Sequence, residues 1–160
     1  IIAWAQAHPQ VDVTYDVALP DGTRVDNHAE SVSFAGVDSA SLDTYIAALS
    51  KLPAVTAVDL GRGDGASALS ADALQALTAA HPDLSFSYSF TAGGIDCSLD
   101  AASLDLTGID AASAAELTPY LPCMTALSSV TLGDEASCKL TWDEIAALEK
   151  ACPQADFDYT

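Results

Sequence analysis

Histidine is the side chain most often used for acid–base catalysis near neutral pH and for binding metal ions, and this chain has three. His8 and His81 occupy the same position of an internal repeat, each before a proline, and Cys152 occupies that position in a third copy. A polar group that recurs where predicted helices end is better explained by the helix dipole and its terminal carbonyl groups than by catalysis. His28 lies in a polar stretch with no partner nearby in sequence. The sequence therefore predicts no catalytic residue and no enzyme.

The cysteines are the other reactive side chains, at positions Cys97, Cys123, Cys138 and Cys152. None belongs to a C-x-x-C pair, and no histidine stands at a spacing that would complete a zinc site. They form up to two disulfides or remain reduced, and the sequence leaves both states open. The glycine-rich stretches at 61–65 and 93–94 lack the Lys-Ser/Thr of a phosphate-binding loop, so we expect no cofactor.

Two groups of loop residues suggest other kinds of site. Arg62-Gly63-Asp64 spells the tripeptide that integrin-type adhesion receptors recognise, although three-residue matches often arise by chance. Asp64, Asp134 and Glu135 are expected at one edge of the sheet, where calcium would find carboxylate ligands. No Asp-x-Asp-x-Asp-Gly loop is present, so we expect no metal site.

The charge of the chain is strongly asymmetric. Its 160 residues include 23 acidic and five basic side chains, which give a formal net charge of −18. Such a surface repels phosphate backbones and anionic lipid headgroups, so we expect no nucleic acid partner. No apolar run reaches the roughly 18 residues of a transmembrane helix, and we expect no direct membrane insertion. Solubility, a cationic partner, divalent ions and adaptation to high salt all remain possible reasons for the acidity.

An internal repeat of about 72 residues organises the chain. Several independent blocks recur at nearly the same offset, so chance does not explain them. The matching blocks are His8–Tyr15, His81–Tyr88 and Cys152–Tyr159; Ser31–Asp38 and Ser103–Asp110; and Val58–Gly61 and Val130–Gly133.

These blocks divide a single repeat domain, residues 1–160, into units. Residues 1–10 are the end of a preceding unit, 11–82 are the first unit, 83–153 are the second, and 154–160 begin a further one. Because neither end carries the polar cap of a complete repeat array, we expect the domain to be excised from a longer chain.

Each unit has the same predicted order of elements: an alternating strand, a hairpin turn, a short strand, an amphipathic helix, a second short strand and a second helix. The first strand is predicted at 11–17 and again at 84–90. Pro119 should shorten or kink the helix predicted at 111–121. Thr141 and Glu144 form a capping box at the start of the last helix.

The two tryptophans receive different interpretations. Trp4 aligns with Leu77 and Leu148 of the later copies, which places it in the core. Trp142 stands in the first turn of its helix, where it either contacts a partner or packs against a neighbouring loop.

The strand sequences at 104–109 (LDLTGI) and 58–61 (VDLG) resemble the L-x-L core of leucine-rich repeats. The whole chain is similar to the leucine-rich-repeat-like domains of large secreted or surface-anchored bacterial proteins. This resemblance implies an α/β fold, a leucine-rich-repeat-like βα solenoid with a mostly parallel sheet on one side, helices on the other and β-hairpins at the repeat junctions. It also implies an extracellular or cell-surface location. One departure is that glycine, not asparagine, follows the strands, which puts an asparagine ladder and a regular curvature in doubt.

The resemblance and the polar outward face of the strands lead to one functional hypothesis and one alternative. The first is a non-catalytic module, expected to be a monomer, that binds a protein or glycan. The alternative is a structural stalk or spacer without a ligand, which is favoured because the outward strand positions lack the Trp, Tyr and Arg typical of binding hot spots. The residues predicted for an interaction surface are Asp59, Arg62, Asp64, Ser85, Ser87, Ser89, Asp105, Thr107 and Trp142.

Overall fold

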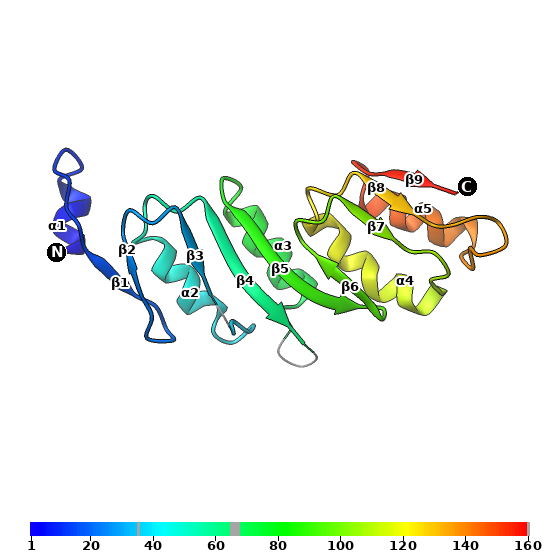
Figure 1. Ribbon diagram of the computed structural model, residues 1–160, viewed down its shortest axis with the longest axis horizontal. Coiled ribbons are helices and arrows are strands. Elements are labelled where there is room, and N and C mark those ends of the chain that lie inside the picture. The colour runs from blue at the N-terminus through cyan, green and yellow to red at the C-terminus, as the bar shows by residue number, and fades with distance from the viewer. Residues whose placement is uncertain (35, 65–67, 160) are drawn as a thin grey trace.

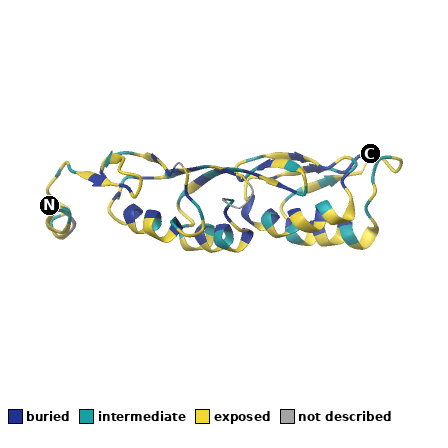
Figure 2. Cartoon of the chain, turned by 90° about the horizontal axis from the view of Figure 1, so that it is seen from below, coloured by how far each residue is buried: buried dark blue, intermediate teal, exposed yellow. Residues whose placement is uncertain are grey.

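The computed structural model describes residues 1–34, 36–64 and 68–159 as an elongated α/β molecule whose two ends lie far apart (Figure 1). The helices lie along one face of the strands, and the opposite face is open (Figure 2). The described part has five α-helices, a 3₁₀ helix and nine strands. In chain order they are α1 (Ile2–Ala7), β1 (Asp16–Ala18), β2 (Arg24–Asp26), β3 (Ser31–Ser33), α2 (Leu42–Leu49), β4 (Ala57–Gly63), α3 (Ala71–Ala80), β5 (Ser85–Ala92), β6 (Ile95–Ser98), β7 (Ser103–Asp105), α4 (Ala111–Leu117), η2 (Thr118–Cys123), β8 (Ser129–Thr131), α5 (Trp142–Ala151) and β9 (Asp156–Asp158).

The predicted leucine-rich-repeat-like solenoid with one mostly parallel sheet is wrong. The strands form three separate sheets: an antiparallel β1–β2 pair, a mixed sheet in the order β3-β4-β5-β6, and a parallel sheet in the order β7-β8-β9. The reason lies at Gly93 and Gly94, whose positive φ angles of 57° and 76° let the chain reverse directly after β5. Strand β6 then returns antiparallel along the edge of β5 where a further parallel strand would pair. Strand β7 therefore starts a new sheet.

The two larger sheets contain the same parallel arrangement of three strands. In the first, Ser31 is opposite Ala57, which is opposite Ser85. In the second, Ser103, Ser129 and Asp156 hold the corresponding positions. The order strand, helix, strand, helix, strand is also the same in both, so the sequence repeat is expressed as two similar halves in different sheets.

The core follows the inward side of the strands and the facing side of the helices. Aliphatic strand residues such as Val58, Leu60 and Val130 are buried, while their neighbours Asp59 and Thr131 lie on the open side or near it. This alternation is what a sheet with one buried face requires. It fixes which side chains of each strand face the solvent.

Several local predictions are confirmed. Helix α4 ends at Leu117, and the chain continues through Pro119 as the 3₁₀ helix η2. The capping box forms at α5, where the Thr141 side chain accepts from the Glu144 backbone N–H and the Glu144 carboxylate accepts from the Thr141 backbone N–H. Each of these depends only on residues close in sequence.

Two predictions for the N-terminal region are wrong. The strand predicted at 11–17 exists only as Asp16–Ala18, and Trp4 is exposed, although it was placed in the core. In the second copy, the equivalent residues are covered because β4 pairs with β5. No described strand takes the corresponding place beside residues 11–15, so the strand and its apolar cover are missing there.

Candidate functional site

The most clearly grouped polar residues lie on the open face of the sheet β3-β4-β5-β6. Asp59 is at the centre, with Ser33 directly opposite on β3 and Ser87 directly opposite on β5. All three residues of this row line a shallow hollow of about 490 Å³. Its lining consists of Ser31, Val32, Ser33, Ala57, Val58, Asp59, Ser85, Phe86, Ser87 and Asp100.

Small donors surround the Asp59 carboxylate. The hydroxyls of Ser33 and Ser87 donate to its two oxygens at 3.5 and 3.3 Å, and the Gly61 backbone N–H donates at 2.8 Å. The two hydroxyl contacts are long, so the serines can turn toward another acceptor or donor at little cost. The row therefore offers a fixed carboxylate between two adjustable hydroxyl groups.

A second polar cluster lies further along β4, around Arg62. The guanidinium donates to Asp64 at 3.0 Å, to Asp96 on β6 at 2.9 Å, and to the Thr91 hydroxyl at 3.4 Å. The hydrogen bond from the Thr91 hydroxyl and the Arg62 charge lower the pKa of Asp96. The hydrogen bonds with Asp64 and Asp96 raise the pKa of Arg62. This cluster joins β4, β5 and β6 and holds one guanidinium between two carboxylates.

The structure of this cluster bears on the Arg62-Gly63-Asp64 tripeptide. Arg62 and Gly63 belong to strand β4, and the Arg62 guanidinium is paired with the Asp64 carboxylate of the same tripeptide. Gly63 is buried, and a Cβ atom there would lie 1.8 Å from the Tyr88 hydroxyl oxygen. The glycine therefore serves close packing against Tyr88, and the two charges neutralise each other instead of facing a receptor separately.

The remaining predicted site residues do not line this hollow. Ser89 lies on β5 between Arg62 and Ser98 and is half-buried. Asp105 belongs to the other sheet, where its carboxylate accepts from the Thr107 backbone N–H at 2.9 Å.

Trp142 lies in the first turn of α5, 77% exposed, with its ring tilted against Tyr159 at a centroid distance of 6.2 Å. Asp59, Ser85 and Ser87 are therefore the predicted residues that the fold gathers in one hollow. Ser33 and Asp100 also line that hollow and were not among the predicted site residues.

A further cluster, at the N-terminal end, was missed entirely. The His28 ring contacts the Asp12 carboxylate at 2.7 Å and the Asp26 carboxylate at 3.1 Å, one at each ring nitrogen. The hydrogen bond to Asp12 is the main cause of a raised His28 pKa, with a smaller contribution from Asp26. The β1–β2 hairpin returns His28 to the segment that contains Asp12, and this long-range contact has no signal in the neighbouring sequence. Asp26 stands only two residues from His28, so the prediction that His28 has no partner nearby in sequence is wrong.

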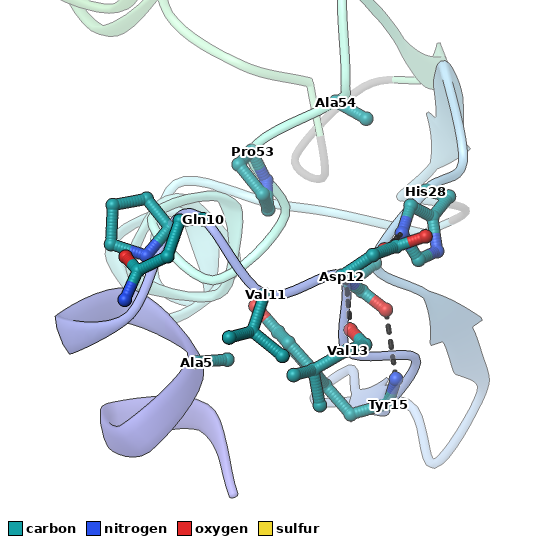
Figure 3. A pocket seen from close by; sticks show the side chains of 11 residues that line it. Ala5, Gln10, Val11, Asp12, Val13, Tyr15, His28, Pro53 and Ala54 are labelled. Carbon is teal, nitrogen blue, oxygen red and sulfur yellow. Dashed lines mark hydrogen bonds and ion pairs between the residues drawn. The ribbon is translucent and has the colours of Figure 1, made fainter.

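This cluster borders an open cavity of about 620 Å³ between the N-terminal segment and the loop that leads to β4 (Figure 3). Val11 and Val13 line it on one side, and Pro53 and Ala54 line it on the other. Because the two carboxylates contact opposite nitrogens of the His28 ring, they cannot converge on one ion together with that ring. The arrangement can hold a proton, and it ties the segment to the hairpin.

The four cysteines are free thiols. Burial raises the pKa of the Cys97 and Cys123 thiols to about 11, and it also raises the pKa of Cys152. Since the thiolate is the reactive form, these three side chains are unreactive members of the core.

Two kinds of site have no structural basis in the part of the chain that is described. Across residues 1–34, 36–64 and 68–159, no three His, Cys, Asp or Glu side chains are grouped so that they could hold a metal ion. The Asp134 carboxylate, considered above as a calcium ligand, accepts hydrogen bonds from the Ser137 backbone N–H and hydroxyl. None of the helices in these ranges has the length and apolar character needed to cross a membrane.

No protein-family model, curated protein or solved structure matches the chain. The resemblance to leucine-rich-repeat-like domains of surface proteins therefore stays a prediction.

Proposed function

We propose that the chain is a non-catalytic interaction module that binds a glycan through the open face of the sheet β3-β4-β5-β6. The observation that supports this most is the row of Ser33, Asp59 and Ser87 on three adjacent strands, beside a hollow of about 490 Å³. Sugar hydroxyls both donate and accept hydrogen bonds, and a carboxylate between two hydroxyl groups offers both functions.

The composition of this face favours a glycan over a protein partner. Protein interfaces depend on a few large anchors, chiefly Trp, Tyr and Arg, in well-packed pockets. The residues around Asp59 are small, and the nearest arginine, Arg62, is already paired with two carboxylates. A polar, shallow face without such anchors suits weak and repeated contacts with a sugar chain. An extracellular location, implied by the family resemblance, belongs to the same proposal.

Screening the protein against an array of neutral and amino-sugar glycans tests the proposal, with each hit measured by titration calorimetry. Asp59→Ala should weaken a specific hit by about tenfold or more, because it removes the central acceptor and releases both serines. Asp72→Ala is the matched control, since Asp72 is exposed in the first turn of α3 rather than on a strand. Equal losses in both variants, or binding only to protein ligands, would refute the proposal.

A structural stalk is the second candidate, and the elongated shape with its distant ends favours it (Figure 1). A stalk predicts that no glycan binds and that Asp59→Ala changes nothing in a cell-surface display assay. Lengthening or shortening the repeat array would then change the function, because distance is what a stalk supplies. These results are opposite to those expected for a glycan-binding face.

A further inference from the structure

The hollow beside Asp59 continues into a second hollow at the junction between the two halves of the molecule. This second hollow has a volume of about 450 Å³, and Ser85, Phe86 and Asp100 line both. Its other walls come from the end of α3, the residue that follows β6, the end of η2 and the loop that leads to β8. Every lining residue lies within 78–126, so the second hollow is formed entirely inside the described chain.

The internal repeat places an equivalent cavity in the first copy. It is the cavity of about 620 Å³ at the N-terminal end of the molecule (Figure 3). Corresponding residues that line the two cavities include Pro9 and Pro82, Val13 and Phe86, Asn27 and Leu99, and Ala54 and Ala126. Because the two cavities hold the same place in the repeat, a difference between their polar groups is informative.

In the first copy, an amide side chain bonds to the edge of the strand segment. The Asn27 side chain donates to the Val13 carbonyl at 3.0 Å and accepts from the Tyr15 N–H at 2.8 Å. In the second copy Leu99 stands at that place, and its buried aliphatic side chain neither donates nor accepts. The second cavity therefore lacks the amide group that the first cavity contains.

The backbone of Phe86 faces the side on which the second hollow lies. The Ser85 N–H donates to the Thr56 carbonyl of the segment that leads into β4. Since the backbone groups of successive strand residues point to opposite sides, the N–H and the carbonyl of Phe86 point away from β4. Phe86 itself lines the second hollow.

Strand β6 does not cover these groups. Its pairing with β5 begins at Ser89, and the last backbone bond beyond it runs from the Leu99 N–H to the Tyr88 carbonyl. Phe86 has no strand opposite on this side within the described ranges, although its side chain is buried. Backbone groups in such a place are normally hydrogen-bonded, so a donor and an acceptor from a ligand fit here.

We propose that the second hollow holds an acetamido group of the bound glycan, so that this face selects N-acetylhexosamines. An acetamido group has one N–H and one carbonyl, which complement the carbonyl and the N–H of Phe86. Its methyl group would meet the apolar side of the hollow, which includes Leu84, Leu99 and Ala126. This inference rests on the proposed glycan binding and names the class of sugar.

Asp100 stands where the two hollows meet. Its exposed carboxylate accepts a hydrogen bond from the Ser98 hydroxyl and has further lone pairs to offer. The ring that carries the acetamido group therefore finds an acceptor for its hydroxyl groups at the boundary, with Asp59 in the first hollow as the next acceptor.

Chitotriose and cellotriose are the probes, because they have the same linkages and differ in carrying an acetamido or a hydroxyl group on each sugar. Titration calorimetry should give an affinity for chitotriose that is about tenfold higher or more. In amide NMR spectra, the Phe86 signal should shift downfield on addition of chitotriose, because its N–H gains an acceptor.

Two substitutions should remove the preference for chitotriose. Leu99→Asn supplies from within the protein the amide that the first copy has, so the affinity for chitotriose should fall to that for cellotriose. Ala126→Trp fills the hollow from an exposed position and should have the same effect without a change in the core. Ala112→Trp is the matched control, since Ala112 is exposed on α4 and lines neither hollow. Thermal unfolding checks that the three variants remain folded.

The outcomes distinguish this inference from the function on which it rests. If neither trisaccharide nor any glycan of the array binds, glycan binding is refuted, and the acetamido site with it. If glycans bind but chitotriose has no advantage, or if the Ala126→Trp protein keeps the advantage, the second hollow does not hold an acetamido group and glycan binding stands.

Discussion

The two β-hairpins of the chain occupy equivalent places but are secured in different ways. At the end of the first, the Asn27 N–H donates to the Tyr15 carbonyl at 3.0 Å, and at the end of the second the Leu99 N–H donates to the Tyr88 carbonyl at the same distance. The side chains then differ. Asn27 accepts from the Tyr15 N–H at 2.8 Å and donates to the Val13 carbonyl at 3.0 Å, whereas Leu99 is packed in the core.

This difference shows what replaces a missing strand. Residues 85–87 are held by parallel pairing with β4, so the hairpin beside them needs only an apolar residue to fill the core. Residues 11–15 have no such neighbour among the described strands, and side chains supply the hydrogen bonds instead. Asn27 is the one buried polar residue found in the described ranges, which fits its use as a substitute for a strand. His28 adds a second attachment through Asp12.

The largest expected loss of stability is at the second hairpin, β5–β6, where Leu99 is packed in the core. Leu99→Ala removes a buried side chain that is 3% exposed and leaves a cavity, so the free energy of unfolding should fall by about 3 kcal/mol. Urea denaturation measures this loss. Asn27→Ala should lose less, because water can reach the freed groups of the half-buried residues Val13 and Tyr15. A larger loss at Asn27 would contradict the contrast between the two hairpins.

A smaller effect is expected when the first hairpin receives the residue of the second. Asn27→Leu removes both hydrogen bonds to the N-terminal segment while adding apolar surface, and the net loss should be about 1 kcal/mol. The backbone amide of Tyr15, which donates to the Asn27 side chain, should exchange with deuterium much faster, as measured by mass spectrometry on proteolytic fragments. The same amide should be unaffected by Leu99→Ala. Unchanged exchange in Asn27→Leu would show that the segment is held by other contacts.

The pH dependence of the first hairpin should be modest and should have a definite sign. The pKa of His28 is raised above its ordinary value of 6.5, with the hydrogen bond to Asp12 as the largest cause. Its stabilisation is therefore fully present below 6.5 and is lost as the pH rises through the raised pKa. Titration of the His28 ring by NMR should show that Asp12→Asn lowers its pKa more than Asp26→Asn does. An unshifted His28 pKa in the native protein would show that the contact between His28 and Asp12 does not help to secure the first hairpin.

The smallest effects are expected at the exposed ion pairs of the two hairpins. The Arg24 Nε and Asp16 Oδ2 atoms are 3.5 Å apart across the first hairpin. At the second hairpin, Asp96 Oδ1 lies 2.9 Å from Nη2 of Arg62 on the neighbouring strand β4. Exposed pairs contribute little to stability, so Asp16→Asn should leave the urea midpoint unchanged. Asp96→Asn should have a slightly larger effect because Asp96 also accepts from Thr91. A substantial loss in Asp16→Asn would mean that charge, rather than Asn27, secures the first hairpin.

The sequence was sufficient wherever the determinant is local. The capping box at Thr141, the interruption of helix α4 before Pro119 and the hairpin turn at Gly93 all follow from residues within one or two turns of each other. The outward direction of Asp59 and Ser87 followed from strand alternation in the same way. The gathering of these two side chains into one hollow then depended on the parallel pairing of β4 and β5, which the repeat also indicated.

The sequence was not sufficient where pairing partners decide the outcome. The alternation at Val11 and Val13 is typical of a strand, but a strand forms only when a neighbour pairs with it, and no described strand does. The exposure of Trp4 has the same cause. The contact between Asp12 and His28 required the hairpin to return the chain by 16 residues, and nothing in the local sequence marks that encounter.

The buried thiols can report the local unfolding of the elements that contain them. Cys97 lies on β6, Cys123 at the end of η2 and Cys152 at the end of α5, and their thiols are covered in the native state. An alkylating reagent applied in a short pulse would modify each sulfur only while its own element is exposed. Mass spectrometry of the modified fragments would then rank the three elements by how readily they detach, without any engineered label.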